Sequence, residues 1–415
     1  MLKQLILENW KSFRYAELPL DPLTVLIGTN ASGKSNVVEA LEFLQRFARG
    51  ESIEVALAGD KMLTPIRGGV EWAARMGENE FTIKVLVSGE DDQTDYLYNI
   101  TLQTKPAINN LTEKITIYNN KDNEYYPIKF GLSTNKLSLK SCLINRSTLN
   151  GISLDFLGNW DLFEKMTEKE LYQTKIIKEN CLNIINNVIV PTIQNILILN
   201  PVPSKMRDYS RLSDTLESDA SNIAGVLAAL PDEQKAEAET TLSEYIKDLP
   251  EGDIKKVWAE KVGRFGTDAM LYCQEEWEPG HITEIDARTM SDGTLRFLGI
   301  LTALLTRPEG SQIVIEEIDN GLHPSRAALL VKILKEIGTK RKIDILLTTH
   351  NPALLDALGP EIVPFVVVAH RNSETGESKL TLLEDIDNFP KLFASYSVGE
   401  MTTKGAIERS LSHGE

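Results

Sequence analysis

The feature that most constrains the fold of this chain is a glycine-rich segment at residues 28–35, Gly-Thr-Asn-Ala-Ser-Gly-Lys-Ser. It follows the apolar run Leu23–Ile27, which predicts a buried strand, and it precedes Val37–Phe47, whose apolar spacing predicts a helix. The segment fits the pattern G-x-x-x-x-G-K-[ST]. Glycines let such a loop turn tightly and direct its N–H groups at phosphate oxygens, and the positive end of the following helix favours the same anion. The sequence therefore predicts a strand–loop–helix unit that binds the phosphates of a nucleotide.

The polar residues of this loop have distinct expected roles. Lys34 is expected to reach the β- and γ-phosphates of ATP, and the Ser35 hydroxyl is expected to bind Mg²⁺. The alternative, a glycine-rich turn with an exposed lysine, is disfavoured because the segment lies between a strand and a helix. The residues expected to contact the nucleotide here are Gly28, Thr29, Asn30, Ala31, Ser32, Gly33, Lys34, Ser35 and Asn36.

Two carboxylates follow a second apolar run, Ile313–Ile315. Parallel sheets bind ligands at the carboxyl ends of their strands, so acids at such an end are candidates for chemistry. Adjacent strand residues point to opposite faces, and the two side chains need not share a role. We expect Glu316 to hold Mg²⁺ through water and Glu317 to orient the attacking water. The alternative is that both acids only end the strand and cap the next segment.

Two further segments are ambiguous when taken alone. His350 follows the apolar run 345–347 and could bind a γ-phosphate, although a single histidine is more often structural. Ser291, Asp292 and Gly293 precede the apolar run 295–305. Either Ser291 or Asp292 is a good helix cap, and a helix start can also bind an anion.

Composition limits the class of protein. The chain has 415 residues, of which 42% are hydrophobic, enough for two to three domain-sized units. Its net charge of −16 opposes a general electrostatic grip on DNA or anionic membrane, without excluding a local basic groove. The three cysteines, Cys142, Cys181 and Cys273, lack metal-ligand spacing and predict reduced thiols. Without a signal peptide or an apolar window of about 20 residues, we expect a cytoplasmic protein with no membrane partner.

The order of predicted elements indicates an α/β fold of the P-loop class, with an antiparallel β-subdomain and a mostly helical insertion. The expected division is 1–145 for the first α/β half, with the phosphate loop and the β-subdomain, 146–275 for the insertion and 276–415 for the second α/β half. Strands are predicted at 2–8, 23–27, 81–87, 96–103, 113–118, 196–199, 313–315, 343–347 and 364–368. Helices are predicted at 37–47, within 146–190, at 214–247 with a break at Pro231, at 295–305 and at 326–337.

These motifs, in this order, resemble the ABC ATPase superfamily, and more narrowly its SMC and RecF branch and the OLD-like bacterial AAA-family ATPases. The resemblance is clear over residues 1–70 and 285–358, and Asn200–Tyr209 also looks familial. Asn9–Phe13 resembles an N-terminal segment of this branch that lies against the nucleotide, which implies that Lys11 contacts ATP. Arg67-Gly68-Gly69 resembles a segment of OLD-like ATPases, without an assigned role.

The resemblance implies that two heads close around ATP. Ser291, Asp292 and Gly293 would be the signature motif, which contacts the γ-phosphate of ATP held by the other protomer. Asp319 would lie in the loop that crosses the dimer interface. Catalysis would then rest on Glu317, Lys34 and His350, the switch histidine.

Three features depart from the family pattern. Glu316 replaces the usual aspartate, Met-Ser-Asp-Gly-Thr replaces Leu-Ser-Gly-Gly-Gln, and Ala31 stands where SMC-like proteins have glycine.

OLD nucleases carry a Toprim nuclease domain after the ATPase, whereas 65 residues follow His350 here. We therefore expect an ATPase without nuclease activity of its own. It would form a homodimer or a higher homo-oligomer and control a separate effector such as a nuclease, like the ATPase subunits of the anti-phage systems Septu and PARIS. The alternatives are a DNA-repair or chromosome-associated ATPase similar to RecF and SMC, and a scaffold that uses ATP structurally. Nucleic acid is a possible partner that the net charge does not indicate.

Overall fold

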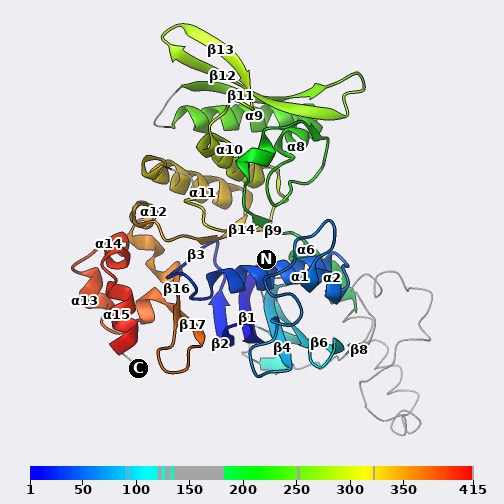
Figure 1. The fold of residues 1–415 in the computed structure, drawn as a ribbon, viewed down its shortest axis with the longest axis vertical. Coiled ribbons are helices and arrows are strands. Elements are labelled where there is room, and N and C mark those ends of the chain that lie inside the picture. Colours follow the sequence, from blue (N-terminus) through cyan, green and yellow to red (C-terminus); the bar gives the residue numbers. More distant parts are fainter. Residues whose placement is uncertain are drawn as a thin grey trace. The chain divides into compact units, whose positions relative to one another are not determined.

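The computed structural model describes residues 1–89, 91, 93–119, 124–126, 132–134, 182–249, 253–320 and 323–413. The chain forms two compact units (Figure 1). The first comprises Met1–Leu20, Asn30–Ile196 and Ala369–Leu380, and the second comprises Asp21–Thr29, Leu197–Val368 and Thr381–Glu415. These bounds differ from the division at residues 145 and 275, which stays a prediction.

An antiparallel sheet forms the centre of the first unit, in the order β2-β1-β4-β5-β6-β7, with β8 paired to β6. Its strands are β1 (Leu2–Trp10), β2 (Phe13–Pro19), β4 (Glu80–Ser88), β5 (Thr94–Gln103), β6 (Asn109–Asn119), β7 (Glu124–Tyr126) and β8 (Leu132–Thr134). Alternate residues of β4 are buried, as expected for a strand with one face on a core. The predicted meander of three consecutive strands is confirmed by β4, β5 and β6.

Helix α1 (Lys34–Ala48) packs on this sheet through aromatic side chains. The Phe43 ring lies 6.1 Å from Trp10 of β1 and 5.8 Å from Phe81 of β4, measured between centroids. The same unit contains α2 (Ile53–Ala58), the π-helix η1 (Ile185–Ile189) and α6 (Val190–Gln194). The helical prediction for 146–181 lies outside the described residues.

A second sheet has the order β17-β16-β3-β15-β14-β9. Its strands are β3 (Leu23–Gly28), β9 (Ile196–Leu199), β14 (Gln312–Ile315), β15 (Asp344–Thr348), β16 (Val366–Arg371) and β17 (Ser378–Leu382). Strands β3, β15 and β14 are parallel neighbours, and Ile345 pairs with both Leu23 and Ile313. All residues of β14 and β15 are buried, which is typical of a parallel sheet covered on both faces.

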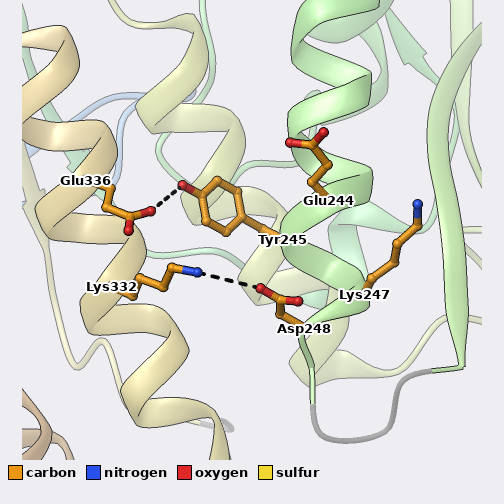
Figure 2. A pocket seen from close by; sticks show the side chains of 6 residues that line it. All are labelled: Glu244, Tyr245, Lys247, Asp248, Lys332 and Glu336. Carbon is orange, nitrogen blue, oxygen red and sulfur yellow. Dashed lines mark hydrogen bonds and ion pairs between the residues drawn. The ribbon is translucent and has the colours of Figure 1, made fainter.

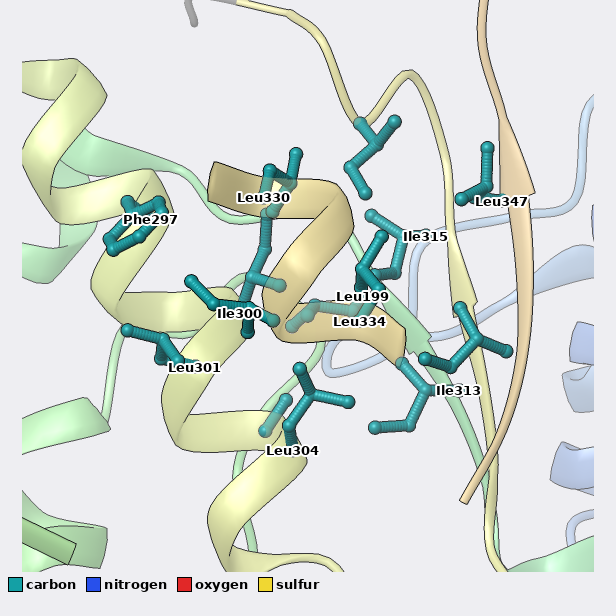
Figure 3. Packing of buried hydrophobic residues seen from close by; sticks show 14 of the residues in the cluster. Leu199, Phe297, Ile300, Leu301, Leu304, Ile313, Ile315, Leu330, Leu334 and Leu347 are labelled. Carbon is teal, nitrogen blue, oxygen red and sulfur yellow. The ribbon is translucent and has the colours of Figure 1, made fainter. Parts of the chain in front are cut away.

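Two helices bury their apolar sides against β14 and its neighbours. These are α10 (Asp292–Thr306) and α11 (Ala327–Arg341), which follows the 3₁₀ turn η2 (Pro324–Arg326). Figure 3 shows Phe297, Ile300 and Leu304 of α10 facing Leu330 of α11 and the side chains of the strands. Helices α10 and α11 and strands β14 and β15 agree with the sequence prediction, because the spacing of their apolar residues follows from their burial.

The segment before α10 contains the expected helices together with an antiparallel sheet that was not predicted from the sequence. The helices are α7 (Pro203–Met206), α8 (Ile223–Ala229) and α9 (Asp232–Lys247). The antiparallel sheet consists of β10 (Ser210–Arg211), which lies between α7 and α8, and of β11 (Ile254–Val262), β12 (Asp268–Glu278) and β13 (His281–Asp286), which follow α9. Helices α8 and α9 cover one face of this sheet (Figure 1). The prediction missed β11 because the lysines and glutamates on its outer face obscured the alternation that buries Val257 and Ala259. Residues 214–222, predicted as helix, precede α8.

Polar contacts join α9 to α11 in the same unit. The Tyr245 hydroxyl donates to Glu336 Oε2 at 2.8 Å, and Lys332 Nζ lies 3.8 Å from Asp248 Oδ2. Figure 2 shows these pairs lining a polar pocket, together with Glu244 and Lys247. The pairs bridge two helices that frame the helix α10, so they help to fix the segment that carries β11–β13.

The last part of the chain is helical. Its elements are α12 (Pro352–Leu358), η3 (Pro360–Phe365), η4 (Leu383–Asp385), α13 (Phe389–Phe393), α14 (Val398–Thr403) and α15 (Ala406–His413). The Gly399 N–H donates to Asp356 Oδ1 at 2.8 Å and fastens α14 to α12. Within the described ranges, no helix has both the length and the apolar character needed to cross a bilayer. Cys273 of β12 is a buried free thiol, and burial raises its pKa to about 12.

Candidate nucleotide site

The glycine-rich loop has the backbone that its sequence predicted. It joins β3 to α1, and Gly28, Ala31 and Gly33 have φ angles of 142°, 62° and 118°. At Gly33 a Cβ would lie 2.8 Å from Phe13 Cζ and 2.9 Å from Ser378 Oγ. Only glycine meets both the conformation and the space at that position.

The start of α1 suits an anion. The helix begins at Lys34, no side chain caps its first turn, and that turn contains no acidic residue. Among the described residues, the Ser32 hydroxyl is buried without a hydrogen-bond partner. A phosphate oxygen would satisfy such a hydroxyl, and the helix dipole favours negative charge at this end. The loop therefore fits a nucleotide phosphate.

The N-terminal segment braces α1. The Trp10 indole N–H donates to the Asn36 carbonyl at 2.7 Å, and the Asn36 amide donates to Ser12 Oγ at 2.7 Å. Asn36, predicted to contact nucleotide, is thus tied to β1 and its following turn. Through these contacts, a segment more than 20 residues earlier in the chain fixes the first turn of α1.

Lys11 lies in a buried ion pair rather than in open solvent. Its ammonium pairs with Glu39 of α1 and donates to the Arg67 carbonyl at 2.9 Å. Burial lowers the pKa of Lys11, and the hydrogen bond with Glu39 acts in the opposite direction. The resemblance implied a contact with ATP, which stays a prediction, while the structure gives Lys11 a neutralising partner.

The parallel strands bring three of the predicted motifs to one edge. Strands β3, β15 and β14 run in the same direction, so their carboxyl ends meet at that edge. Gly28 and Thr29 leave β3 there, Glu316 and Glu317 leave β14, and His350 follows β15 after Thr349. The Thr349 N–H donates to the Leu26 carbonyl of β3 at 3.3 Å. This edge is where open α/β sheets bind ligands.

Glu317 has an unusual backbone. Its φ is 48°, in the left-handed region that non-glycine residues seldom adopt. The Glu317 N–H donates to Thr348 Oγ1 at 2.8 Å, which links β14 to β15 and helps to hold this conformation. Glu317 is exposed and Glu316 is half-buried, so the two acids have different surroundings. Both lie after β14 has ended at Ile315, so the strand alternation expected from the sequence does not explain this difference. Sequence reasoning missed Thr348, whose only signal was its position at a strand end.

Asp319 and His350 are close to each other. The Thr349 hydroxyl donates to Asp319 Oδ1 at 2.6 Å, and His350 Nδ1 lies 4.0 Å from Asp319 Oδ2. The Asp319 side chain is 9% exposed and that of His350 is 64% exposed. The distance is too long for a hydrogen bond, so Asp319 lies beside an imidazole that is largely open to solvent. The position of Asp319 at a dimer interface stays a prediction.

The Ser291 segment is both a helix cap and an accessible helix start. Ser291 Oγ accepts from the Thr294 N–H at 3.1 Å and caps α10, while Ser291 and Asp292 are exposed. The Ser291 segment can therefore be a helix cap and an anion-binding helix start at the same time. Arg207, in the familial segment 200–209, donates from Nη2 to the Met290 carbonyl and to Asp292 Oδ1, both at 2.7 Å. Sequence reasoning missed this arginine, which fixes the residues on both sides of Ser291.

A second arginine was also missed. Arg371, at the end of β16, donates from Nε to the Ala31 carbonyl of the phosphate loop at 3.0 Å. The two residues are 340 positions apart, and no local pattern links them. Within the described ranges, no group of three or more His, Cys, Asp and Glu side chains could hold a metal ion. Mg²⁺ in nucleotide sites is held mainly by phosphate, water and one or two side chains, so Ser35 and Glu316 remain the predicted ligands.

Comparisons with known proteins agree with this geometry. The family model described as an AAA ATPase domain matches residues 1–355. The chromosome partition protein Smc of Mycobacterium tuberculosis is 38% identical over 86 residues, which cover 20% of this chain and 7% of that protein. The Smc of Mycolicibacterium paratuberculosis gives the same values. This chain thus matches only a small part of the length of these curated relatives.

A solved structure extends the similarity of fold over most of the chain. An SMC head bound to the C-terminal winged-helix domain of ScpA is 12% identical, with 92% of this chain and 96% of that chain covered and a TM-score of 0.50. The SMC head domain from Thermotoga maritima is 15% identical, with 92% and 98% covered and a TM-score of 0.43. The first of these supports the predicted fold class. The chain belongs to the AAA ATPase domain family, and its fold resembles that of an SMC head.

Proposed function

We propose that this ATPase closes as a dimer of heads around two ATP–Mg²⁺ complexes, hydrolyses them, and uses the cycle to control a partner effector protein. The observation that carries the proposal is the common edge of β3, β15 and β14. That edge collects the start of the phosphate loop, the two glutamates and the histidine. Few arrangements other than a nucleoside triphosphatase use all of these groups together.

In the proposed mechanism, the loop N–H groups and Lys34 bind the phosphates. Ser35 and Glu316 would hold Mg²⁺, which would supply positive charge to the transferring phosphoryl group. Glu317 orients the water for in-line attack, since its side chain is exposed and its backbone is fixed by Thr348. His350 donates a hydrogen bond to the γ-phosphate. The acceleration comes from positioning and electrostatics rather than covalent chemistry.

The second protomer would complete each site. Ser291 and Asp292 are exposed at the positive end of the 15-residue helix α10. That end favours an anion, and the Ser291 hydroxyl can turn from its cap to a phosphate oxygen. The bond from Arg207 to Asp292 reduces the negative charge near this helix start. These features support a contact with the γ-phosphate of ATP bound by the partner protomer.

The Glu317→Gln variant tests the assignment. It should bind ATP as the wild type does, hydrolyse it at least ~100-fold more slowly, and remain dimeric in ATP and Mg²⁺. Turnover is measured by phosphate release and mass by light scattering after gel filtration. The matched control is Glu309→Gln, because Glu309 is exposed and precedes the other end of β14. A Glu317→Gln protein with wild-type turnover would show that another group orients the water.

The proposed effector is a separate protein with nuclease or toxin chemistry, in an anti-phage defence system. The support is the resemblance to OLD-like ATPases, and the solved SMC head that carries a bound ScpA domain shows that such a fold can present a partner surface. The test is to tag Glu317→Gln, purify it from its native host in ATP, and identify co-purifying proteins by mass spectrometry. A stoichiometric small nuclease or toxin would support this role.

A chromosome-associated or DNA-repair role is the second candidate. It is favoured by the 38% identity to chromosome partition proteins over 86 residues, and it is opposed by the net charge of −16. This role predicts that double-stranded DNA stimulates ATP hydrolysis at low salt. Recovery of DNA and repair proteins with the trapped variant would favour it over the defence role. A scaffold that uses ATP structurally would assemble normally with slow turnover, unchanged by Glu317→Gln.

A further inference from the structure

The hairpin formed by β16 and β17 contacts the phosphate loop, although it lies beyond residue 355, where the family match ends. Two residues that flank its turn make the contacts. Before the turn, Arg371 Nε donates to the Ala31 carbonyl at 3.0 Å. After the turn, the Ser378 hydroxyl donates to Ser12 Oγ at 2.7 Å and the Ser378 N–H donates to the Ser12 carbonyl at 3.0 Å. Ser378 Oγ is also among the atoms nearest to Gly33. The hairpin therefore bonds to the loop at Ala31 and, beside Gly33, to the N-terminal segment that braces α1.

Ala31 needs support that a glycine would not need. Its φ of 62° lies in the left-handed region, where the Cβ of an L-residue is crowded by the following carbonyl. Glycine adopts this conformation without that penalty. Ala31 therefore carries backbone strain in the phosphate loop that a glycine at the same position would not carry. A hydrogen bond to the Ala31 carbonyl favours the strained conformation over its alternatives.

Arg371 is suited to this role. Its guanidinium donates through Nε, which lies close to the stem of the side chain, so the bond fixes the arginine as well as the carbonyl. A hydrogen bond with a charged donor is stronger than one between neutral groups. Arg371 is itself exposed, but the strand before it, Val366–Ala369, is buried and anchors it.

We propose that Arg371 is a positioning residue for nucleotide binding: it holds Ala31, and with it the phosphate loop, in the conformation that receives ATP. The inference rests on the proposed nucleotide site and adds a region outside the family match to it. Arg371 acts through the loop rather than on the chemistry, so its loss changes the affinity for ATP more than the rate at saturation.

A double-mutant cycle separates this role from a direct contact with ATP. The dissociation constant for ATP–Mg²⁺ is measured by calorimetry for the wild type, Arg371→Ala, Ala31→Gly and the double variant. We expect Arg371→Ala to weaken binding about tenfold in the alanine background, as one charge-assisted hydrogen bond allows, and about twofold or less in the glycine background. With glycine at position 31 the loop conformation carries no strain, so the loss of Arg371 should change the affinity for ATP less in that background.

Two further variants complete the test. Arg371→Lys keeps the charge and should restore part of the affinity, and Arg264→Ala, an exposed arginine in the other unit, should leave binding unchanged. Turnover at saturating ATP should stay within about twofold of wild type for Arg371→Ala. An equal loss of affinity in both backgrounds would overturn the proposal in favour of a direct contact. A wild-type protein that binds no ATP would overturn the proposed function itself.

Discussion

Replacing Glu113 with glutamine should stabilise the protein at neutral and alkaline pH but not in acid. Glu113 is a residue of β6 with 5% exposure, and its carboxylate accepts a hydrogen bond from the Tyr98 hydroxyl of β5. Burial raises the pKa of Glu113 to about 7, because a medium of low polarity disfavours the ionised form, while the Tyr98 hydrogen bond acts against this rise. The folded sheet therefore prefers a protonated Glu113.

The sign and size of the effect follow from proton linkage. Between pH 4.5 and 7 the folded protein holds a proton on Glu113 that the unfolded chain has released, so stability falls as the pH rises. One pKa unit corresponds to ~1.4 kcal/mol, and the interval between the two pKa values corresponds to about 3 kcal/mol. The wild type loses this full amount of stability above pH 7 and none of it below pH 4.5. Glutamine does not ionise, and its carbonyl can still accept from Tyr98.

The assay compares thermal unfolding of wild type and Glu113→Gln from pH 5 to pH 8. The variant should match the wild type at pH 5 and melt higher at pH 8, by on the order of 5 °C. The difference between the two proteins is the useful quantity, because buried Asp344, whose pKa is raised to about 6, adds the same pH dependence to both. Glu80→Gln, an exposed carboxylate in the same sheet, is the control. A difference that does not change with pH, or a variant less stable at pH 8, would refute the reasoning.

Three further predictions concern the nucleotide site. Gly33→Ala should abolish ATP binding in calorimetry, because its Cβ would lie 2.8 Å from Phe13 Cζ at a φ of 118°; retained binding would mean that the loop can shift. Thr348→Val removes the acceptor of the Glu317 N–H and should lower kcat roughly tenfold with KM nearly unchanged; a change confined to KM would contradict this. Arg207→Ala should weaken ATP-dependent dimerisation in analytical ultracentrifugation without changing the affinity of one head for ATP, and a selective loss of that affinity would contradict its role at α10.

The parts of the fold that the sequence predicted are those set by local rules. The strand–loop–helix of β3 and α1, and the alternation of β14, α11 and β15, follow from apolar periodicity and from turn residues. The sheet of β11–β13 was missed, since its outer face is exposed and charged. A strand with one solvated face shows a weaker signal when lysine and glutamate alternate with small apolar residues.

The site residues also fall into those that the sequence predicted and those that it did not. The phosphate loop and the acidic strand end are contiguous motifs, so their residues could be named from spacing alone. Thr348, Arg207 and Arg371 could not, because each acts through a contact with a distant segment, such as the bond from Arg371 to Ala31. The burial of Lys11 and its ion pair with Glu39 likewise depend on the tertiary fold, so they could not be predicted from local sequence.

Cys273 offers a way to observe the β11–β12 sheet opening by itself. The thiol is 0% exposed and its pKa is raised to about 12, so in the closed sheet it is protonated and out of reach of alkylating reagents. Each transient opening would expose it for capture. The experiment uses a chain whose Cys142 and Cys181 are replaced by serine, so that Cys273 alone is labelled. The labelling rate then gives the free energy of local opening of this sheet, with and without ATP. Comparison with the free energy of unfolding of the whole molecule tells whether the sheet opens separately.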